Sequence, residues 1–79
     1  MSELASMDIK ANVGLRLREL RQAKALSQEA LANKADLDRT YVTDVENGRR
    51  NISIENIEKL VKALEISIKD FFDAPNFRN

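Results

Sequence analysis

The chain contains no cysteine and no histidine among its 79 residues. Without thiols it has no disulfide and no thiolate nucleophile, and without imidazole it lacks the usual ligand of transition metals. No apolar run approaches the roughly 18 residues of a membrane span, and the start, MSELASMD, lacks the regions of a signal peptide. These absences predict a cytoplasmic protein with no metal, no cofactor, no membrane contact and no evident small-molecule ligand.

The acidic residues offer little basis for catalysis. Glu29, Glu46 and Glu58 lie in segments with helical spacing, and no histidine, cysteine or glycine-rich loop completes a site with them. A metal site made of carboxylates alone would need several acids to converge, and the spacing brings none together. We therefore expect a protein that is not an enzyme.

The chain carries no net charge, because 13 Lys and Arg residues balance 13 Asp and Glu residues. A neutral total is unusual for a nucleic-acid binder, since neutralisation of phosphates supplies most nonspecific affinity. The two signs are unevenly distributed, however. The basic residues of the first two thirds include Arg16, Arg18, Arg21, Lys24, Lys34, Arg39, Arg49 and Arg50. The last third has an acidic bias from Glu55, Glu58, Glu65, Asp70 and Asp73. This polarity is compatible with a basic face that meets DNA.

The low content of glycine and proline, two residues and one residue, favours an all-α fold. Helical spacing covers residues 8–23, 28–35 and 39–47, a segment capped by Ser53, and a short segment that runs from Ser67 through Phe72 and stops at Pro75. The whole chain is expected to be one small domain with a core at 9–72 and loose ends at 1–7 and 75–79.

Two of these helices have clear apolar stripes. The first stripe consists of Ile9, Val13, Leu17 and Leu20, and the second of Ile54, Ile57, Leu60, Val61 and Leu64.

The stretch SQEALANKADLDRTYVTDVENG, residues 27–48, has the layout of a helix-turn-helix at the second and third helices. Ser27 and Asp38 are N-cap residues whose side chains accept from free backbone amides. Between these helices, Ala35-Asp36-Leu37 forms the turn, and aspartate tolerates the positive φ that such a turn often needs. Gly48, after Asn47, supplies a helix stop of the left-handed type.

Three residues of the first turn of the third helix are candidate base contacts, namely Arg39, Thr40 and Tyr41. Arg39 can hold guanine O6 and N7 with two hydrogen bonds, and Thr40 can meet a thymine methyl group or a phosphate. Tyr41 can pack on thymine or the sugar, or it can half-bury against the first helix. For Arg39 the alternative is a solvated surface arginine.

Gln28 begins the second helix, where its amide and the free backbone amides can hold a phosphate. On that basis, replacing Gln28 weakens binding to all sequences alike; the alternative is a helix-start residue without a DNA role. Arg49, Arg50, Asn51 and Ser53 follow the recognition helix and can contact phosphates, and Arg50 can also reach a base. A solvated basic loop is the alternative for this group.

Two acids of the third helix need separate interpretations. Asp44 lies one turn beyond Arg39, where it can accept from a cytosine N4, pair with a nearby arginine or point away, and the sequence does not choose between these. Glu46, near the end of the helix, can meet an arginine of the first helix in a structural ion pair.

The last apolar cluster, Ile66, Ile68, Phe71 and Phe72, is larger than so small a core requires. We interpret it as partly core and partly the face of a dimer. The same cluster supports an alternative function, in which the fold is a protein-interaction module that binds a partner through Ile66, Phe71 and Phe72.

The motifs LSQEALA and YVTDVENG resemble those of phage repressors and the wider xenobiotic-response-element group of bacterial regulators, over about residues 9–72. Within that group, the stretch DRTYVTDVENGRRNISIENIEKLVKALEIS is similar to the controller proteins of restriction-modification systems. Two positions depart from the group's pattern. Ala25 stands where glycine is common, and Asp36 stands where glycine or asparagine is common.

The resemblance implies a five-helix, sequence-specific transcriptional regulator that binds pseudo-palindromic operators as a homodimer. Its targets would be its own gene and a restriction endonuclease gene, and RNA polymerase is a further candidate partner. The residues implied at or near bases are Arg39, Thr40, Tyr41 and Arg50, and those at phosphates are Gln28, Asn51 and Ser53. An ion pair between Arg21 and Glu46 and a dimer interface on the C-terminal helices are implied too. A prophage-type repressor or an antitoxin-like regulator is an alternative within the group.

Overall fold

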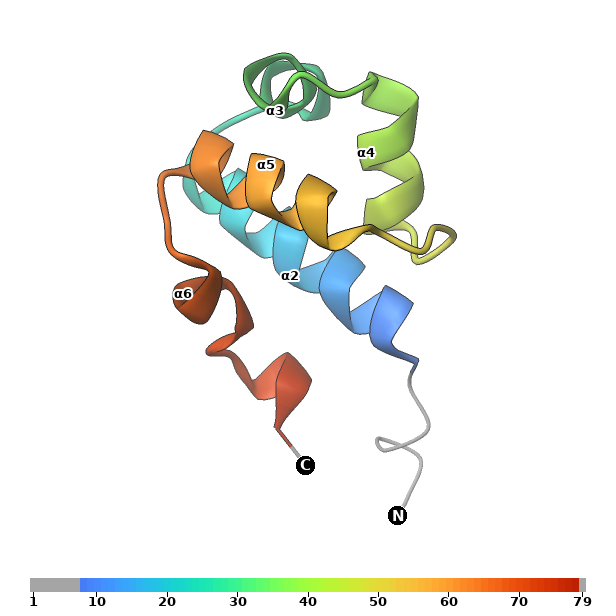
Figure 1. Ribbon diagram of the computed structural model, residues 1–79, viewed down its shortest axis with the longest axis vertical. Helices are drawn as coiled ribbons and strands as arrows, with labels where there is room; N and C mark the ends of the chain where they lie inside the picture. Colours follow the sequence, from blue (N-terminus) through green and yellow to red (C-terminus); the bar gives the residue numbers. More distant parts are fainter. Residues whose placement is uncertain (1–7, 79) are drawn as a thin grey trace.

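The computed structural model describes residues 8–78, in which helices are joined by short loops and no strand occurs (Figure 1). In chain order the elements are α2 (Ile9–Ala23), α3 (Gln28–Ala35), α4 (Arg39–Glu46), α5 (Ile54–Leu64), α6 (Ile68–Phe72) and a 3₁₀ helix, η1 (Pro75–Phe77). The predicted all-α fold of five helices is confirmed for this part of the chain. The expectation for residues 1–7, and for Asn79, lies outside the described residues.

Serine and aspartate side chains start four of the helices. Ser27 Oγ accepts from the backbone N–H of Ala30 at 3.0 Å, and Ser53 Oγ accepts from that of Asn56 at 3.0 Å. Asp8 and Ser67 cap α2 and α6 in the same way. Each cap satisfies an amide that has no partner within its helix, which is why these boundaries can be predicted from sequence.

Asp38 is an exception to the predicted capping. It has the extended backbone of an N-cap residue before α4, but its side chain makes no capping hydrogen bond. The predicted carboxylate cap is therefore wrong. Asp38 is exposed, so water can satisfy both the carboxylate and the first amides of α4 at little cost in free energy.

Left-handed residues end four of the helices. Asp36 after α3 has a φ of 59° and Gly48 after α4 has a φ of 73°, as the turn chemistry predicts. After α4 the N–H of Gly48 donates to Val45 O and that of Arg49 to Asp44 O, which satisfies the last carbonyls. Ala25 adopts a φ of 57° where the family commonly has glycine, so α2 still ends at Ala23.

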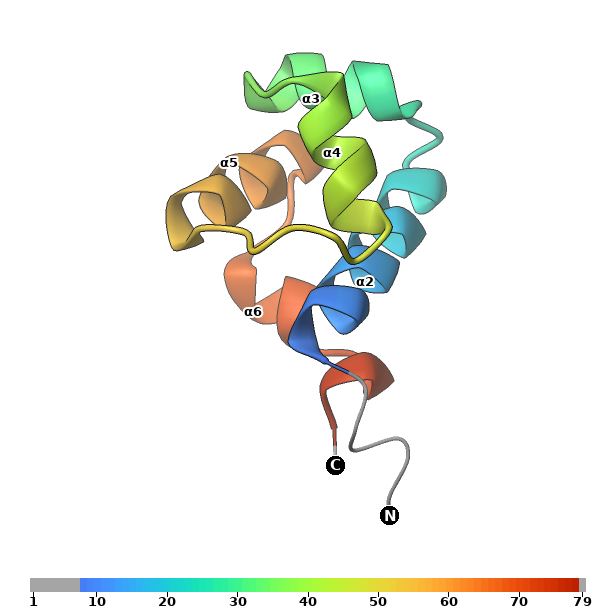
Figure 2. The same cartoon turned by 90° about the vertical axis from the view of Figure 1, so that its right-hand side faces the viewer.

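The helices pack around one core. α2 packs against α4, and α3 packs against both α4 and α5, so that α4 is supported from two sides (Figure 2). The buried apolar residues include Val13, Leu17, Leu31, Ala32, Val42, Val45, Leu60, Val61, Leu64 and Phe71. No helix within residues 8–78 is both long and apolar enough to cross a membrane.

Two residues of the predicted apolar stripes are not in the core. Ile9 is 60% exposed and Ile54 is 80% exposed, which corrects their assignment. Each is the first residue of its helix. Helical spacing puts them on the core-facing side, but it does not show that the neighbouring helices stop short of them.

The C-terminal end is ordered where the sequence predicted a loose segment. Residues 75–77 form η1, which packs on α2, and Phe77 lies 4.9 Å from Phe72 between ring centroids. The expectation for residues 75–78 is therefore wrong. Proline suits the first position of a helix, and burial of the Phe77 ring offsets the loss of chain entropy.

Arg16 fastens α6 to α2, a role that the sequence did not reveal. Its Nε donates to the carbonyl of Phe71 at 2.7 Å, and its Nη2 donates to that of Asp70 at 2.7 Å. These carbonyls lie in the last turn of α6, and that of Asp70 also accepts a longer hydrogen bond from the N–H of Asp73, at 3.3 Å. The guanidinium thus acts as a C-terminal cap supplied by another helix.

Gly14 allows α2 and α4 to approach closely. A Cβ atom at this position would lie 2.3 Å from the carbonyl oxygen of Val45 and 2.8 Å from that of Glu46. Both atoms belong to the backbone of α4, which cannot move without disturbing the helix. Gly14 therefore sets the distance between the long helix and the recognition helix.

We predict that Gly14→Ala lowers the free energy of unfolding by roughly 1–3 kcal/mol, because the added methyl group forces the two helices apart. The intrinsic preference of alanine for helices opposes this loss by about 1 kcal/mol. Urea unfolding followed by circular dichroism measures the difference. Gln22→Ala, at an exposed position of the same helix, is the control and should stay within about 0.5 kcal/mol of the parent. Unchanged stability of Gly14→Ala would contradict the close approach.

Candidate nucleic-acid interface

The N-terminal turn of α4 is presented to solvent. Arg39 and Thr40 are both exposed there, whereas Val42 and Val45 on the opposite side are buried in the core. Within residues 8–78 Arg39 takes part in no ion pair, so its guanidinium is available to an external acceptor. The predicted recognition turn is thus accessible, and its helix is held by packing on the other side.

Tyr41 and Arg50 lie together beside this turn. The guanidinium carbon of Arg50 is 4.8 Å from the centroid of the Tyr41 ring, a cation–π arrangement. Tyr41 is half-buried and packs against the core, while Arg50 is exposed. Both residues line an open groove with Asp38 and Thr40. The stacking brings Arg50, from the loop after α4, next to the start of the recognition helix.

The loop after α4 supplies further polar groups. Arg49 and Asn51 are exposed, and Ser53 is exposed while its hydroxyl oxygen accepts from Asn56 as the cap of α5. The hydroxyl hydrogen of Ser53 stays available as a donor. Asn51 and Ser53 lie just before α5, whose first backbone amides have no partners within the helix, whereas Arg49 lies next to the end of α4.

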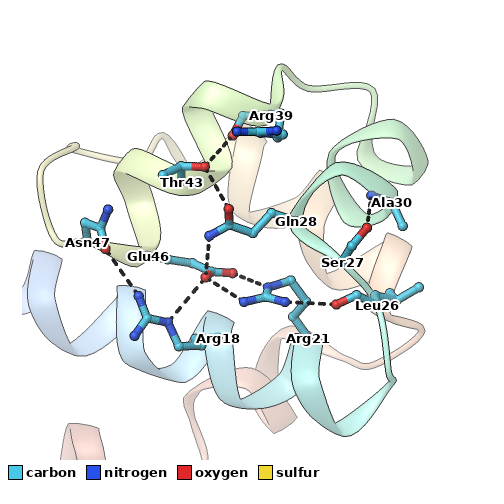
Figure 3. A network of polar contacts seen from close by, with 10 residues as sticks. All are labelled: Arg18, Arg21, Leu26, Ser27, Gln28, Ala30, Arg39, Thr43, Glu46 and Asn47. Atoms are coloured by element: carbon cyan, nitrogen blue, oxygen red, sulfur yellow. Dashed lines mark hydrogen bonds and ion pairs between the residues drawn. The ribbon is translucent and has the colours of Figure 1, made fainter.

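Gln28 is not free at the start of α3. Its Nε2 donates to Glu46 Oε1 at 3.0 Å, and its Oε1 accepts from the hydroxyl of Thr43 at 3.0 Å (Figure 3). Sequence reasoning placed this amide on a phosphate and did not single out Thr43. The only available signal was spacing, since Thr43 and Glu46 lie three residues apart on one face of α4.

Glu46 is the centre of a buried polar network (Figure 3). Arg21 contacts both of its oxygens, with Nε donating to Oε2 at 2.6 Å and Nη2 to Oε1 at 3.0 Å. The ion pair that the resemblance implies is therefore present. Arg18 Nε adds a contact of 3.4 Å, and the same arginine donates to Asn47 Oδ1 at 3.2 Å. Sequence reasoning missed Arg18, although it lies one turn from Arg21 on α2.

The network keeps Glu46 charged in spite of burial. Burial raises the pKa of the Glu46 carboxyl, but hydrogen bonds from Arg21, Gln28 and Arg18 and the charge of Arg21 outweigh this effect. The pKa of Glu46 consequently lies below its ordinary value of 4.5. The hydrogen bond to Glu46 also raises the pKa of Arg21. Arg21 Nη1 donates in addition to the carbonyl of Leu26, which ties the network to the loop before α3.

Asp44 stays the least explained acid of α4. It is half-buried, and its carboxylate forms no ion pair within residues 8–78. Of the alternatives left open by the sequence, pairing with a nearby arginine is therefore absent from this part of the chain.

The predicted dimer face needs one correction. Phe71 is only 2% exposed and packs in the core, with ring centroid distances of 5.0 Å to Phe72 and 6.3 Å to Phe77. It has no surface to offer a partner, because the aromatic cluster under η1 encloses it. Ile68 is 46% exposed, and Ile66 and Phe72 are half-buried.

Comparisons with known proteins agree with this arrangement. Residues 17–71 match the helix-turn-helix family. The chain is similar to the control protein C.BamHI of Bacillus amyloliquefaciens, with 44% identity over 73 residues that cover 91% of this chain and 90% of the relative.

Two solved structures are also similar. The restriction-modification controller protein C.AhdI of Aeromonas hydrophila has 54% identity and a TM-score of 0.78, over 80% of this chain and 96% of the other. The controller protein C.Esp1396I, as a tetramer in complex with its natural 35 base-pair operator, has 36% identity and a TM-score of 0.77, over 92% of this chain and 90% of the other.

We predict that Glu46→Gln lowers the free energy of unfolding at neutral pH by about 3 kcal/mol, because two arginines lose the charge that compensates them. The charged carboxylate stabilises the fold fully above the ordinary pKa of 4.5, and this stabilisation is lost as the pH falls through the lowered pKa of the folded state. The parent protein should therefore lose more stability than Glu46→Gln between about pH 5 and pH 3.

Urea unfolding at several pH values measures both effects. Glu58→Gln is the control, since its carboxylate is exposed and 3.9 Å from Lys62, and its loss should be below about 1 kcal/mol. Parallel pH profiles for the parent and Glu46→Gln would show that folding does not lower the pKa of Glu46.

Proposed function

Because the chain belongs to the helix-turn-helix family and, within it, to the controller proteins of restriction-modification systems, we propose that it regulates transcription by binding operator DNA as a homodimer. The observation that carries the proposal is Arg39 at the start of α4, which is exposed and forms no ion pair with the residues that the structure describes. An α-helix fits the major groove, and a helix-turn-helix enters it by the N-terminal residues of the second helix. The relatives are named control or controller proteins, which supports a regulatory role for this chain and no catalytic one.

The division of labour at the DNA follows from the positions of the side chains. Arg39 holds a guanine with two hydrogen bonds, and Thr40 contacts a thymine methyl group or a phosphate. Tyr41 is half-buried, so it offers the edge of its ring and its hydroxyl to the major groove of the DNA. Its ring also supports Arg50, whose guanidinium carbon lies 4.8 Å from the ring centroid. Arg50 then reaches a base or a phosphate at the flank of the site.

Phosphate contacts come from the loop and from helix starts. Arg49, Asn51 and Ser53 lie on the loop between α4 and α5, and their donors face solvent. The free backbone amides at the N-terminus of α3 are a further anion site of the ordinary kind. These contacts position the two helices on the duplex without reading its sequence.

The regulatory role is autoregulation in a restriction-modification operon. We propose operators upstream of the gene for this chain and of a restriction endonuclease gene, with RNA polymerase as a further partner. The support is the similarity to control proteins and to one controller that is known in complex with its operator. In a symmetric dimer the two α4 helices would lie about 34 Å apart, in successive major grooves.

A second copy of the chain fits the groove where α2, α5 and α6 meet. This groove has a volume of about 150 Å³ and is lined largely by the apolar residues Ile9, Val13, Ile52, Ile57 and Phe72. Ile54 lies one helical turn before Ile57 and is 80% exposed. In a two-fold dimer each Ile54 can cover the partner's groove, so that both copies bury the same apolar patch.

The charges near this groove agree with a self-complementary contact. Lys10 lines the groove and Glu55 follows Ile54, and neither forms an ion pair within residues 8–78. Phe72 is the member of the face predicted from sequence that reaches the groove, whereas Ile66 and Ile68 are near the other end of α6 and stay a prediction.

We predict that Arg39→Ala costs about 1–3 kcal/mol of binding free energy on the native operator and relaxes the preference at one base pair. Arg49→Ala should instead weaken binding to native and scrambled duplexes alike. It should also reduce the slope of log affinity against log salt concentration by about one, the value for one phosphate contact. Fluorescence anisotropy with duplexes of about 30–40 base pairs from the DNA upstream of the gene, at two salt concentrations, measures both.

The parent protein is expected to bind the native duplex more tightly than the scrambled one, with affinity that falls steeply as salt rises. Equal losses on both duplexes for Arg39→Ala and Arg49→Ala would overturn the division of labour. Weak and equal binding of the parent protein to every upstream duplex would favour the protein-interaction module.

We predict that Ile54→Glu converts the protein to a monomer, because a carboxylate cannot be buried in the partner's apolar groove. Sedimentation equilibrium measures the molecular mass, and circular dichroism checks that the variant is folded. Ile68→Glu changes another exposed isoleucine, one of the face predicted from sequence, and it should stay dimeric if the groove is the interface. If Ile68→Glu dissociates and Ile54→Glu does not, the interface lies at the start of α6, as the sequence alone indicated.

A further inference from the structure

The side chain of Gln28 belongs to α3, but both of its hydrogen bonds go to α4. Nε2 donates to Glu46 Oε1 and Oε1 accepts from Thr43 Oγ1, each at 3.0 Å. Thr43 and Glu46 lie three residues apart, so one amide spans nearly a full turn of the recognition helix (Figure 3). Off-axis contacts at two points along a helix restrain both its rotation about its axis and its tilt.

The orientation of this amide is determined by its neighbours. A carboxylate can only accept hydrogen bonds, so the NH₂ group of Gln28 must face Glu46 and its carbonyl oxygen must face Thr43. Glu46 is itself held by Arg21 through two contacts of 2.6 Å and 3.0 Å. The amide is consequently attached to a buried carboxylate that Arg21 already holds through both oxygens.

Thr43 links the amide to the start of the recognition helix. Its hydroxyl oxygen is 3.0 Å from Gln28 Oε1 and 3.1 Å from the carbonyl oxygen of Arg39. The single hydroxyl hydrogen of Thr43 is shared between these two acceptors, so contacts run from the buried Glu46 through Gln28 and Thr43 to the backbone of Arg39. Arg39 is the residue whose guanidinium must point at a base with both of its hydrogen bonds aligned.

We propose that Gln28 and Thr43 are positioning residues that set the rotation of α4, and through it the direction in which Arg39 meets the DNA. This inference rests on the proposed function. It differs from the expectation that the side chain of Gln28 holds a phosphate, because the carbonyl oxygen and one of the two N–H donors of its amide are bound to α4. The two roles differ in one measurable respect. Loss of a phosphate contact weakens every sequence alike, whereas loss of positioning reduces the discrimination between sequences.

The test compares Gln28→Ala, Thr43→Val and the double variant, with Asn33→Ala, at an exposed position of α3, as the control. Anisotropy titrations use the upstream duplex and the same duplex with the single base-pair change that weakens the parent protein most. We expect each single variant to lower the ratio of the two affinities by about tenfold, within the range of one bidentate arginine contact. Both changes break the same chain of hydrogen bonds. The ratio of affinities for the double variant should therefore lie within about twofold of that for Gln28→Ala.

A second measurement needs no DNA. In ¹H–¹⁵N spectra of the free protein, Gln28→Ala and Thr43→Val should both shift the amide signals of residues 39–43 and speed their hydrogen exchange. Asn33→Ala should leave these signals in place. Urea unfolding of each variant ensures that the affinities compare folded proteins.

The outcomes separate the inference from the proposed function. Equal weakening of both duplexes by Gln28→Ala, with Thr43→Val like the parent, would overturn positioning in favour of a phosphate contact. Unchanged amide signals in α4 would overturn it as well. If the parent protein prefers no duplex, the proposed function fails, while the spectra still decide whether Gln28 and Thr43 hold α4.

Discussion

The buried carboxylate of Glu46 is the constraint on which the relative arrangement of α2, α3 and α4 depends. A charged group without solvent requires partners on all sides, and here they come from α2 as Arg18 and Arg21 and from α3 as Gln28. Breaking such a pair costs more than its formation contributes, because the remaining charge stays buried. The network therefore specifies one relative placement of α2, α3 and α4 more strongly than apolar packing alone would.

Gly14 contributes to the same contact between α2 and α4 by leaving space for it. Its missing side chain lets the backbone of α2 approach the carbonyls of Val45 and Glu46, which brings Arg18 and Arg21 within reach of the carboxylate. A larger residue would lengthen these contacts, and electrostatic energy in a poorly solvated site falls quickly with imperfect geometry. The close backbone approach and the ion pair thus depend on each other.

Local chemistry explains which features could be predicted from sequence. The serine caps, the left-handed Asp36 and the stop at Gly48 involve residues within five positions of each other, so their signals survive without tertiary information. The exposure of Ile54, the Arg16 contacts with α6 and the partners of Gln28 join distant segments. Helical periodicity identifies a face, but it does not show where the covering helix ends or which polar partner lies opposite.

The Glu46 network bears on how a chain without net charge could recognise a DNA sequence. Arginines on α2 are used to hold Glu46, so the charge available to phosphates is smaller than the number of basic residues suggests. If the chain acts as proposed, nonspecific affinity is correspondingly modest, and discrimination comes from well-directed contacts of Arg39 and its neighbours. On that proposal the protein gains specificity by fixing the direction of few side chains, and two linked copies supply the affinity that one copy lacks.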